Sequence, residues 1–540
     1  MRTKDLIEKR KRRERKHMRS QKNNTVKQQV VETSVKEKYV LPADFPEEVL
    51  AELKHLPRFI SSEEILRRRD MRDILTFTID PEDAKDFDDA LSFVTLDNGN
   101  YQIGIHIADV THYVPEGSAV DEEAYQRGTS IYLVDRVIPM LPERLCNELC
   151  SLRPHEDKAC MSVIVEMDAH AKVVRHKICR TVICSDYRLT YQQAQQYIEG
   201  NITDSTHDSE NLSHVLPLLN KLAQQLRSKR FERGAINFET PEVRFRLDDD
   251  GNPIEILFRQ LTDANHLIEE FMLLANRIVA KEIGVKGKDD HESSQPDKPF
   301  VYRIHDVPDP EKIAKLGTFI RQLGFQLRTS SKRSVQNKHI NSLLDSCQGT
   351  NSQTLIETLT IRSMSKAVYS TSNIGHYGLA FPYYTHFTSP IRRYPDMMVH
   401  RLLSKYLLQS KAPCRHDKEV LEEACVHCSD TEQMAQMAER DSTKEMQARW
   451  ISQHLGETFE GVISGVTEFG LFVQLRDTMT EGLVPIRTIE PHDYMQYDED
   501  NYCLIAARSG KTYTLSDSVR VRVVKADVER KQIDFVLVEE

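Results

Sequence analysis

The sequence Asp80-Pro-Glu-Asp-Ala-Lys-Asp86-Phe-Asp88-Asp89 follows directly on an apolar run that covers residues 74–79. This run predicts a buried strand, because its side chains are β-branched, aromatic or aliphatic and a proline follows closely. The carboxylates of Asp80, Asp86, Asp88 and Asp89 are therefore expected to leave the strand end together in one loop. Crowded carboxylates repel one another, so a site that gathers them normally holds a cation.

Oxygen ligands of this kind favour a hard divalent ion. We expect Mg²⁺, with Mn²⁺ as the alternative, since Mg²⁺ leaves room for water and substrate phosphates. A solvated acidic turn is the competing interpretation of such a cluster. A calcium loop of the EF-hand type fits poorly, because it needs Gly at its sixth position and Glu at its twelfth, where this chain has Lys85 and Leu91.

Length and composition indicate a chain of two or more domains without a membrane span. The chain has 540 residues, 29% of them charged, and a net charge of -10. An acidic average does not exclude a nucleic-acid partner, because the distribution of charge matters more than its sum. No apolar stretch approaches the length of a transmembrane helix, and the basic N-terminus has no apolar core typical of a secretory signal.

The ten cysteines are scattered, which suggests reduced thiols in a cytoplasmic protein. Cys425 and Cys428 have a spacing that also occurs in zinc sites. They lie in a helical pattern without a second tight pair nearby, so buried or surface thiols are the favoured interpretation.

Four segments are expected along the chain. Residues 1–38 form a basic, disordered arm, and residues 39–70 form a short helical lead-in. Residues 71–455 form one large α+β domain, interrupted by a polar loop over 286–298. Strand-like runs come first, among them Ser130–Val134, and helical patterns follow, among them Tyr191–Glu199. Residues 456–540 carry several short alternating strands with glycines at the corners, which is typical of an OB-fold barrel.

Several motifs beyond the acidic loop resemble one family. They are His106–Val114, Arg127–Tyr132, Val137–Glu143, Leu149–Pro154 and Thr385-His-Phe-Thr-Ser-Pro-Ile-Arg-Arg-Tyr-Pro-Asp396. In this order they resemble the catalytic domain of the ribonuclease II/ribonuclease R (RNB) family, and the residues of each motif are closest to those of the ribonuclease R branch. Phe469-Gly-Leu-Phe-Val473 resembles the S1-type RNA-binding barrel that ends these proteins.

The resemblance implies a processive exoribonuclease that hydrolyses single-stranded RNA from its 3′ end and releases nucleoside 5′-monophosphates with Mg²⁺. The chemistry of the acids agrees, because carboxylate-held metal ions can generate hydroxide and stabilise the leaving oxygen. Asp80, Asp86, Asp88 and Asp89 match the four acids of the family, and Asp86 and Asp88 are also expected to be catalytic.

The resemblance also assigns RNA contacts. Tyr132 matches the aromatic residue that stacks on the 3′-terminal base, and Phe238 matches its partner on the other side, although an ordinary core aromatic is the alternative for Phe238. Tyr191 and Glu269 resemble residues near the 2′-hydroxyl, which distinguishes RNA from DNA. For Glu269, the alternatives are an ion pair on a helix face or a role for the neighbouring Glu270.

Arg392 matches the arginine at the scissile phosphate, where a guanidinium can hold two phosphate oxygens. Arg393 is expected to share this contact. Glu439 resembles a glutamate that supports the site, with a surface salt bridge as an equally weighted alternative. His106, His376 and His386 are expected either to support the metal ligands from behind or to be structural, since hard Mg²⁺ does not favour imidazole.

In the C-terminal barrel, Phe469, Phe472 and Tyr494 are candidates for base stacking. Strand alternation places Phe472 and Leu471 on opposite faces. The resemblance further implies two cold-shock-type domains ahead of the catalytic domain, where this chain has about 70 mostly basic or helical residues. The absence of these domains motivates a non-catalytic RNA-binding protein as the alternative function, and a metal-dependent endonuclease is a more distant third. We expect a monomer.

Overall fold

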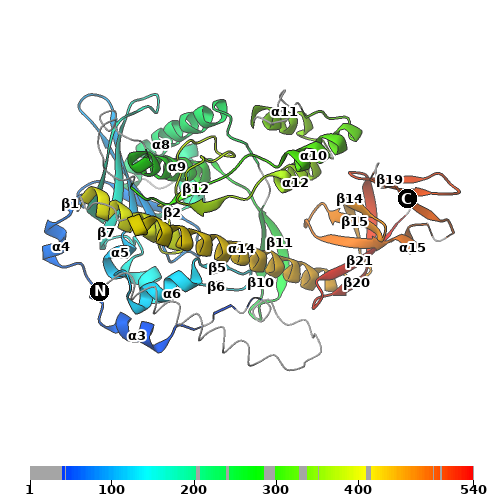
Figure 1. Cartoon of the computed structure of the whole chain (residues 1–540), viewed down its shortest axis with the longest axis horizontal. Coiled ribbons are helices and arrows are strands. Elements are labelled where there is room, and N and C mark those ends of the chain that lie inside the picture. Colours follow the sequence, from blue (N-terminus) through cyan, green and yellow to red (C-terminus); the bar gives the residue numbers. More distant parts are fainter. Residues whose placement is uncertain are drawn as a thin grey trace.

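The computed structural model describes residues 39, 41–42, 44–201, 207–238, 242–284, 298–327, 337–350, 352–408, 415–490, 492–498 and 502–538. The predicted arm over 1–38 and nearly all of the predicted loop over 286–298 lie outside these residues. A mixed sheet domain is followed by a closed five-stranded barrel, so the predicted α+β class with a C-terminal OB-fold is confirmed (Figure 1).

The sheet domain is built on a seven-stranded sheet in the order β1-β8-β7-β4-β3-β2-β9. Neighbouring strands of this sheet are antiparallel, except for the pairs β1–β8 and β2–β9, which are parallel. The strands are β1 (Arg69–Asp70), β2 (Thr76–Asp80), β3 (Asp89–Thr95), β4 (Tyr101–Ala108), β7 (Asp157–Met167), β8 (Val173–Cys184) and β9 (Tyr187–Thr190).

The acidic loop joins two neighbouring strands of this sheet. Residues 76–79 of β2 are buried, as the apolar run predicts, and the loop begins where β2 ends at Asp80. It ends at Asp89, the first residue of β3. The first and last acids therefore stand at the ends of two adjacent strands, whose positions the sheet fixes.

Helices cover the sheet and extend the domain. The nine-residue helix α7 has the predicted bounds, because Thr190 and Gln193 form a capping box at its start and Gly200 ends it in the left-handed conformation. The helices of the sheet domain are α3 (Glu47–Lys54), α4 (Ser62–Leu66), α5 (Val110–Tyr113), α6 (Ala119–Arg127), the π-helices η1 (Arg144–Leu149) and η2 (Ser404–Leu408), α7 (Tyr191–Glu199), α8 (His207–Glu232), α9 (Asp263–Gly284), α10 (Pro310–Gln322), α11 (Asn337–Cys347), α12 (Gln353–Ser363), α13 (Tyr394–Leu403) and α14 (Arg415–Ser452).

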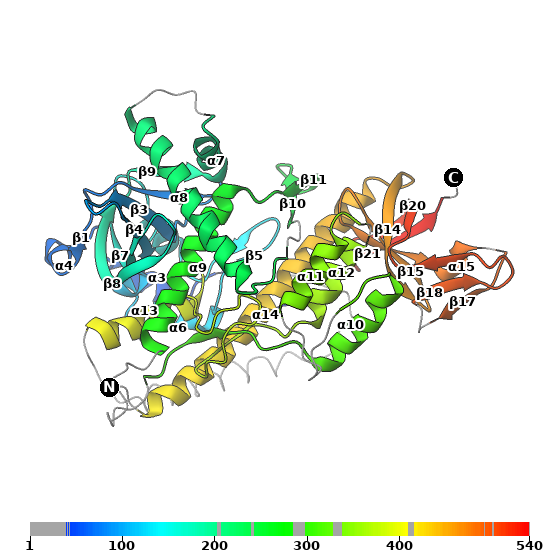
Figure 2. The same ribbon diagram turned by 90° about the horizontal axis from the view of Figure 1, so that it is seen from above.

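The longest helix, α14, runs from the sheet domain to the barrel (Figures 1 and 2). Three two-stranded sheets complete this part of the chain. They are β5 (Ile131–Tyr132) with β6 (Val137–Ile138), β10 (Glu242–Leu247) with β11 (Pro253–Arg259), and β12 (Tyr302–Ile304) with β13 (Val368–Ser370). Helix α14 contacts β5, β11 and β13, so one element connects several parts of the fold.

The barrel closes in the order β14-β15-β16-β21-β20, and a separate three-stranded sheet is inserted into it. Its elements are β14 (Thr458–Thr467), β15 (Gly470–Leu475), β16 (Glu481–Pro485), α15 (Ile486–Ile489), β17 (Met495–Asp498), β18 (Cys503–Ala506), β19 (Thr512–Thr514), β20 (Ser518–Asp527) and β21 (Gln532–Leu537). Barrel side chains belong to the same apolar cluster as α10, α11 and α12. The ring of Phe319 on α10 lies 5.2 Å from that of Tyr502.

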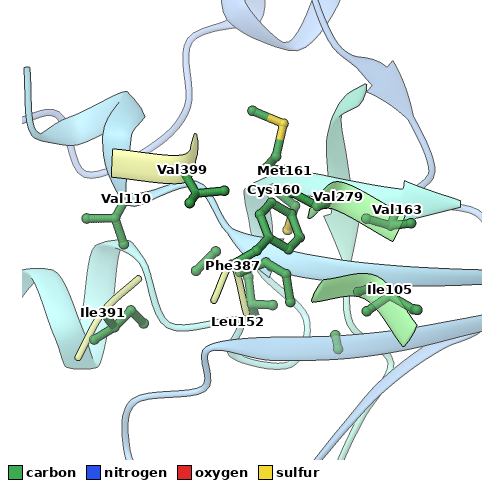
Figure 3. Close-up of a cluster of buried hydrophobic side chains, with 14 of the residues drawn as sticks. Ile105, Val110, Leu152, Cys160, Met161, Val163, Val279, Phe387, Ile391 and Val399 are labelled. Atoms are coloured by element: carbon green, nitrogen blue, oxygen red, sulfur yellow. The ribbon is translucent and has the colours of Figure 1, made fainter. Parts of the chain in front are cut away.

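The main core fills the space between the sheet, α9 and the segment around Ile391 (Figure 3). Phe387 is buried beside Leu152, which comes from a distant part of the sequence, and Ile391 and Ile105 belong to the same buried cluster (Figure 3). This packing holds the Thr385–Asp396 motif against the sheet.

Two general features bear on the expectations from composition. In the described part of the chain, no helix has both the length and the apolar character needed to cross a bilayer. None of the nine described cysteines forms a disulfide. Cys425 and Cys428 are buried in α14, and His427 is hydrogen-bonded to the carbonyl of Tyr125. Cys414 lies outside the described residues.

Candidate active site

The four acids of the loop influence one another electrostatically. Burial raises the pKa of Asp80 and of Asp89. Repulsion from Asp88 and Asp86 raises the pKa of Asp80 further, and repulsion from Asp80 raises that of Asp89. Burial is also the main cause of the raised pKa of Asp86, and it raises the pKa of Asp88 to about 8. A carboxylate whose anionic form is this disfavoured needs a nearby positive charge to remain ionised near neutral pH.

Asp88 is the most buried of the four, with 6% of its surface exposed. Its Oδ1 accepts a hydrogen bond of 3.0 Å from the backbone N–H of Ile391. Its Oδ2 lies 3.4 Å from Nε of Arg392, whose side chain is 42% exposed. The structure thus brings together an acid and an arginine that are about 300 residues apart in the sequence.

The turn that carries Arg392 is held from inside the protein. The backbone N–H of Ser389 donates to Oδ1 of Asp396 at 2.7 Å, and Nη2 of Arg393 donates to the same oxygen at 2.8 Å. Nη2 of Arg392 donates to the hydroxyl of Ser389 at 3.0 Å.

Arg393, which we expected beside the phosphate, is largely buried and paired with Asp396. The expected contact of Arg393 with the phosphate stays a prediction. The two neighbouring arginines point differently, because Arg393 forms a β-bridge with Thr129 and its side chain turns toward Asp396.

Tyr132 lies at the same site, with 42% of its surface exposed. Its backbone N–H donates to Oε1 of Glu439 on α14 at 2.9 Å. The backbone carbonyl of Arg392 accepts from the N–H of Ser130, two residues before Tyr132. Glu439 and Arg392 also interact electrostatically, so Tyr132, Glu439, Arg392 and Asp88 form one constellation.

The two residues expected near the 2′-hydroxyl lie on neighbouring helices. Tyr191 opens α7, directly after Thr190, which is the β9 partner of Asp80. Glu269 on α9 is bonded to Arg230 at 3.1 Å and lies 3.4 Å from His266, which helps to lower its pKa against the opposing effect of burial.

Glu269 keeps 42% of its side chain exposed, with Oε1 facing Arg230 and Oε2 facing Arg227 and His266. The rival Glu270 is buried against Arg230. Of the two, Glu269 has the accessible carboxylate.

Phe238 lies half-buried and packs against the cluster that joins α10–α12 to the barrel. No contact between Phe238 and Tyr132 is found among the aromatic pairs of the described residues. Its role as a stacking partner stays a prediction, and the core interpretation matches its packing.

The motif histidines are buried and bonded within the protein. His106 lies between the hydroxyls of Ser92 and Ser162, at 2.8 Å from each. Burial lowers the pKa of His106 and of His376 to about 3 and keeps both rings neutral. His386 accepts or donates one bond with the hydroxyl of Tyr369 at 2.7 Å.

The barrel presents aromatic side chains at its surface. Phe469 is 67% exposed and Tyr494 is 76% exposed. In β15, Leu471 is buried while Phe472 is half-buried, as the alternation predicts. Phe472 lies over Gly465, where an added Cβ would come within 3.3 Å of its side chain.

The chemistry of the donor set fits a hard divalent cation. One oxygen of Asp80 is buried without a hydrogen-bond partner, and the neighbouring carboxylates repel it. Among the described residues, however, no group of three or more His, Cys, Asp or Glu side chains is arranged to hold a metal ion without adjustment.

Sequence reasoning missed two residues that hold the acidic loop. Nη2 of Arg188 on β9 bonds the carbonyls of Pro81 and Glu82. The hydroxyl of Ser151 bonds the carbonyl of Lys85 and the N–H of Phe87. Both residues stand within stretches that carry other candidates, but nothing in their type or spacing signals a bond to the backbone of a distant loop.

Comparison with known proteins follows the same division of the chain. Residues 68–409 match the family described as the RNB domain, and residues 452–537 match the S1 RNA binding domain. Ribonuclease R of Thermotoga maritima is 43% identical over 504 residues, which cover 92% of this chain and 69% of that protein. Ribonuclease R of Aquifex aeolicus is 40% identical over 504 residues, which cover 93% of this chain and 69% of that protein.

A solved structure is similar over most of the chain. It is that of Mycoplasma genitalium RNase R in complex with ribose methylated single-stranded RNA, with a TM-score of 0.85 and 27% identity. The match covers 93% of this chain and 77% of that chain.

Proposed function

This chain belongs to the ribonuclease R family of RNB-domain proteins, and on that premise we propose that its acidic loop and the Arg392 turn form the catalytic centre of a 3′-to-5′ exoribonuclease. The family supports hydrolytic RNA degradation that depends on a metal ion. The observation that carries the assignment of the centre is the contact of buried Asp88 with both Ile391 and Arg392.

Arg392 has the position and exposure expected of a phosphate ligand. Its guanidinium is tied on one side to Asp88 and Ser389, while 42% of the side chain remains exposed. A planar guanidinium can hold two phosphate oxygens and stabilise the charge that grows there during cleavage. Asp88 orients this group as well as belonging to the acidic loop.

Mg²⁺ is the cofactor that we propose, with Mn²⁺ as a substitute. Asp80, Asp86, Asp88 and Asp89 would hold it, since all their donors are hard oxygens. When bound, such an ion supplies a nucleophilic hydroxide at neutral pH and charge stabilisation for the leaving oxygen. The protein contributes the loop, which must keep four mutually repelling carboxylates close together.

Tyr132 places the 3′-terminal base in this proposal. Its side chain is 42% exposed and interacts electrostatically with Arg392, so a base stacked on the ring would have its phosphate near the guanidinium. Stacking tolerates any base, which suits an enzyme that degrades RNA of any sequence. Phe238 is retained only as a second stacking candidate.

Discrimination of RNA from DNA is assigned to Tyr191 and Glu269. The 2′-hydroxyl can donate a hydrogen bond, and an ionised carboxylate accepts it. Glu269 meets this requirement because its pKa is lowered and its carboxylate is accessible.

The S1 domain binds RNA before the strand reaches this centre. The exposed rings of Phe469 and Tyr494, with half-buried Phe472, are the stacking candidates that we propose on its surface. We further propose a cytoplasmic monomer that acts on single-stranded RNA. The free thiols of its cysteines support a reducing compartment.

A time course on 5′-labelled single-stranded RNA with Mg²⁺ tests the function, with the Asp88→Asn protein as its matched control. We expect full-length RNA to give way to a short limit product in wild type only, while Asp88→Asn still binds the RNA. Internal fragments would indicate an endonuclease, and bound but intact RNA with wild type would indicate a non-catalytic binding protein. Either result contradicts the proposal.

A further inference from the structure

Arg188 reaches from the edge strand of the sheet to the backbone of the acidic loop. Its Nη2 donates to the carbonyl oxygen of Pro81 at 2.6 Å and to that of Glu82 at 2.7 Å. These are the first two residues after Asp80. One guanidinium nitrogen therefore fixes the direction in which the chain leaves the strand.

The sheet register explains why this residue can reach the loop. Strands β9 and β2 run parallel, with Arg188 opposite Thr78 and Thr190 opposite Asp80. Arg188 thus lies two residues before the strand end, and its long side chain spans the remaining distance along the sheet.

The far half of the loop is held by a different residue. The hydroxyl of Ser151 donates to the carbonyl of Lys85 at 2.8 Å and accepts from the N–H of Phe87 at 3.0 Å. Asp86 lies between these two bonded residues. The loop is therefore fixed on both sides of the acids, with Arg188 holding the side next to Asp80.

Arg188 also acts on Asp80 through its charge. It lowers the pKa of that carboxyl, opposing burial and the repulsion from Asp88 and Asp86. The charge of Arg188 and its hydrogen bonds have opposite effects on the affinity of the site for a divalent cation. A positive charge beside the site repels the ion, whereas a fixed loop places the carboxylate to bind it.

We propose that Arg188 is a positioning residue for the metal site, and that its hold on Pro81 and Glu82 outweighs the repulsion of its own charge. The inference rests on the proposed assignment of the acids as metal ligands. Residues that orient metal ligands typically change metal affinity about 10–100-fold when they are replaced. The two carbonyl bonds make Arg188 such a residue for Asp80.

The test is a titration of the full chain with Mn²⁺ in the absence of RNA. The electron paramagnetic resonance signal of free Mn²⁺ measures how much of the ion is bound. We expect Arg188→Gln to bind Mn²⁺ about tenfold more weakly than wild type. Arg188→Lys keeps the charge and can still donate to a carbonyl, so its loss should be smaller. If Arg188→Gln does not fold, the Mn²⁺ affinity of Arg188→Lys still tests the proposal.

Arg144→Gln is the matched control. Arg144 likewise donates to two backbone carbonyls, those of Leu53 and Leu56, at 2.6 and 3.0 Å, but these carbonyls belong to the end of α3 and the residues just after it, not to the acidic loop. Both Gln variants lose two hydrogen bonds and should show similar falls in melting temperature. Only Arg188→Gln should lose Mn²⁺ affinity.

The other outcomes overturn the inference in distinguishable ways. Unchanged or tighter Mn²⁺ binding by Arg188→Gln means that loop positioning is not the dominant effect. Weaker RNA binding by Arg188→Gln at saturating Mn²⁺ means that Arg188 contacts RNA instead. If wild type binds no more Mn²⁺ than Asp88→Asn, the proposed metal site itself fails, and the inference fails with it.

Discussion

Oε1 of Glu439 accepts a hydrogen bond of 2.9 Å from the backbone N–H of Tyr132. The two residues are 307 positions apart, and Glu439 belongs to the helix that continues to the barrel. A side-chain oxygen thus takes the place of a strand partner for Tyr132. It fixes the backbone of the residue that we propose as the base-stacking platform.

This relationship separates two roles of Glu439. Replacing it by Gln keeps an oxygen that can accept the Tyr132 N–H, but removes the charge beside Arg392. Replacing it by Ala removes both, at a cost of about 1 kcal/mol in the free energy of unfolding for the lost hydrogen bond. If positioning dominates, single-turnover cleavage by Glu439→Gln stays close to wild type, while Glu439→Ala is slower. Equal losses in the two variants would instead assign the effect to the charge.

Tyr132→Ala should lengthen the limit product of RNA digestion. The last base loses its stacking surface, which contributes about 1–3 kcal/mol per base in single-strand binding. Short products then dissociate before the final cleavages. Tyr132→Phe keeps the ring and should leave the product length unchanged. Denaturing electrophoresis of exhaustive digests measures both, and an unchanged length for Tyr132→Ala would contradict the placement of the base.

Local patterns in the sequence predicted the elements that local chemistry determines. The buried part of β2 follows from its apolar run, and α7 has the predicted bounds because its capping residues are adjacent in sequence. Where an element differs from the prediction, contacts with residues distant in sequence are the reason. A strand was predicted over 130–134, but the ladder covers only Ile131 and Tyr132, because the N–H groups of Tyr132 and Val134 bond side chains of α14.

The candidate site likewise combines features that the local sequence predicts with features that depend on distant residues. Its residue types could be named from motifs, but their directions depend on tertiary partners. Neighbouring Arg392 and Arg393 are chemically identical, yet Asp88 draws one toward the acidic loop and Asp396 holds the other inside. The partner of Arg393 lies only three residues away, but the partner of Arg392 is about 300 residues away, so the local sequence does not show which arginine faces the acidic loop. Helices α11 and α12 and the inserted sheet of β17–β19 were also not predicted.

The buried histidines predict acid sensitivity. His106 is fully buried, and its pKa is lowered to about 3, whereas an unfolded histidine has a pKa of about 6.5. Below the unfolded value, the unfolded chain gains a proton that the folded chain does not. The stabilising contribution is therefore complete above about pH 6.5 and is lost as the pH falls toward 3, by up to about 1.4 kcal/mol per pH unit.

Urea unfolding of wild type and His106→Gln at about pH 7.5 and about pH 5.5 measures this contribution. The acids of the loop have raised pKa values and change stability in the opposite direction, so the comparison is between the pH dependences of the two proteins. His106→Gln should lose less stability on acidification than wild type. The exposed His492 supplies the control, and His492→Gln should behave as wild type. Parallel pH dependences of wild type and His106→Gln would contradict a neutral, buried His106.

RNA binding by the barrel is better tested by point variants than by its deletion. Residues of the barrel share an apolar cluster with α10–α12, so removing residues 456–540 would expose core side chains of the sheet domain. Phe469 is 67% exposed, whereas Phe472 is half-buried over Gly465. The two aromatic residues therefore differ in how much they contribute to folding.

We expect Phe469→Ala to weaken binding of long single-stranded RNA by about 1–3 kcal/mol without lowering the melting temperature. Phe472→Ala should weaken binding and also destabilise the barrel, because its packing is lost. Neither variant removes a charge, so the dependence of affinity on salt should keep its slope. Single-turnover cleavage at saturating enzyme should be unchanged for Phe469→Ala, since the residue lies in a different domain from Asp88. An RNA affinity equal to that of wild type would show that the exposed ring of Phe469 is not a stacking surface.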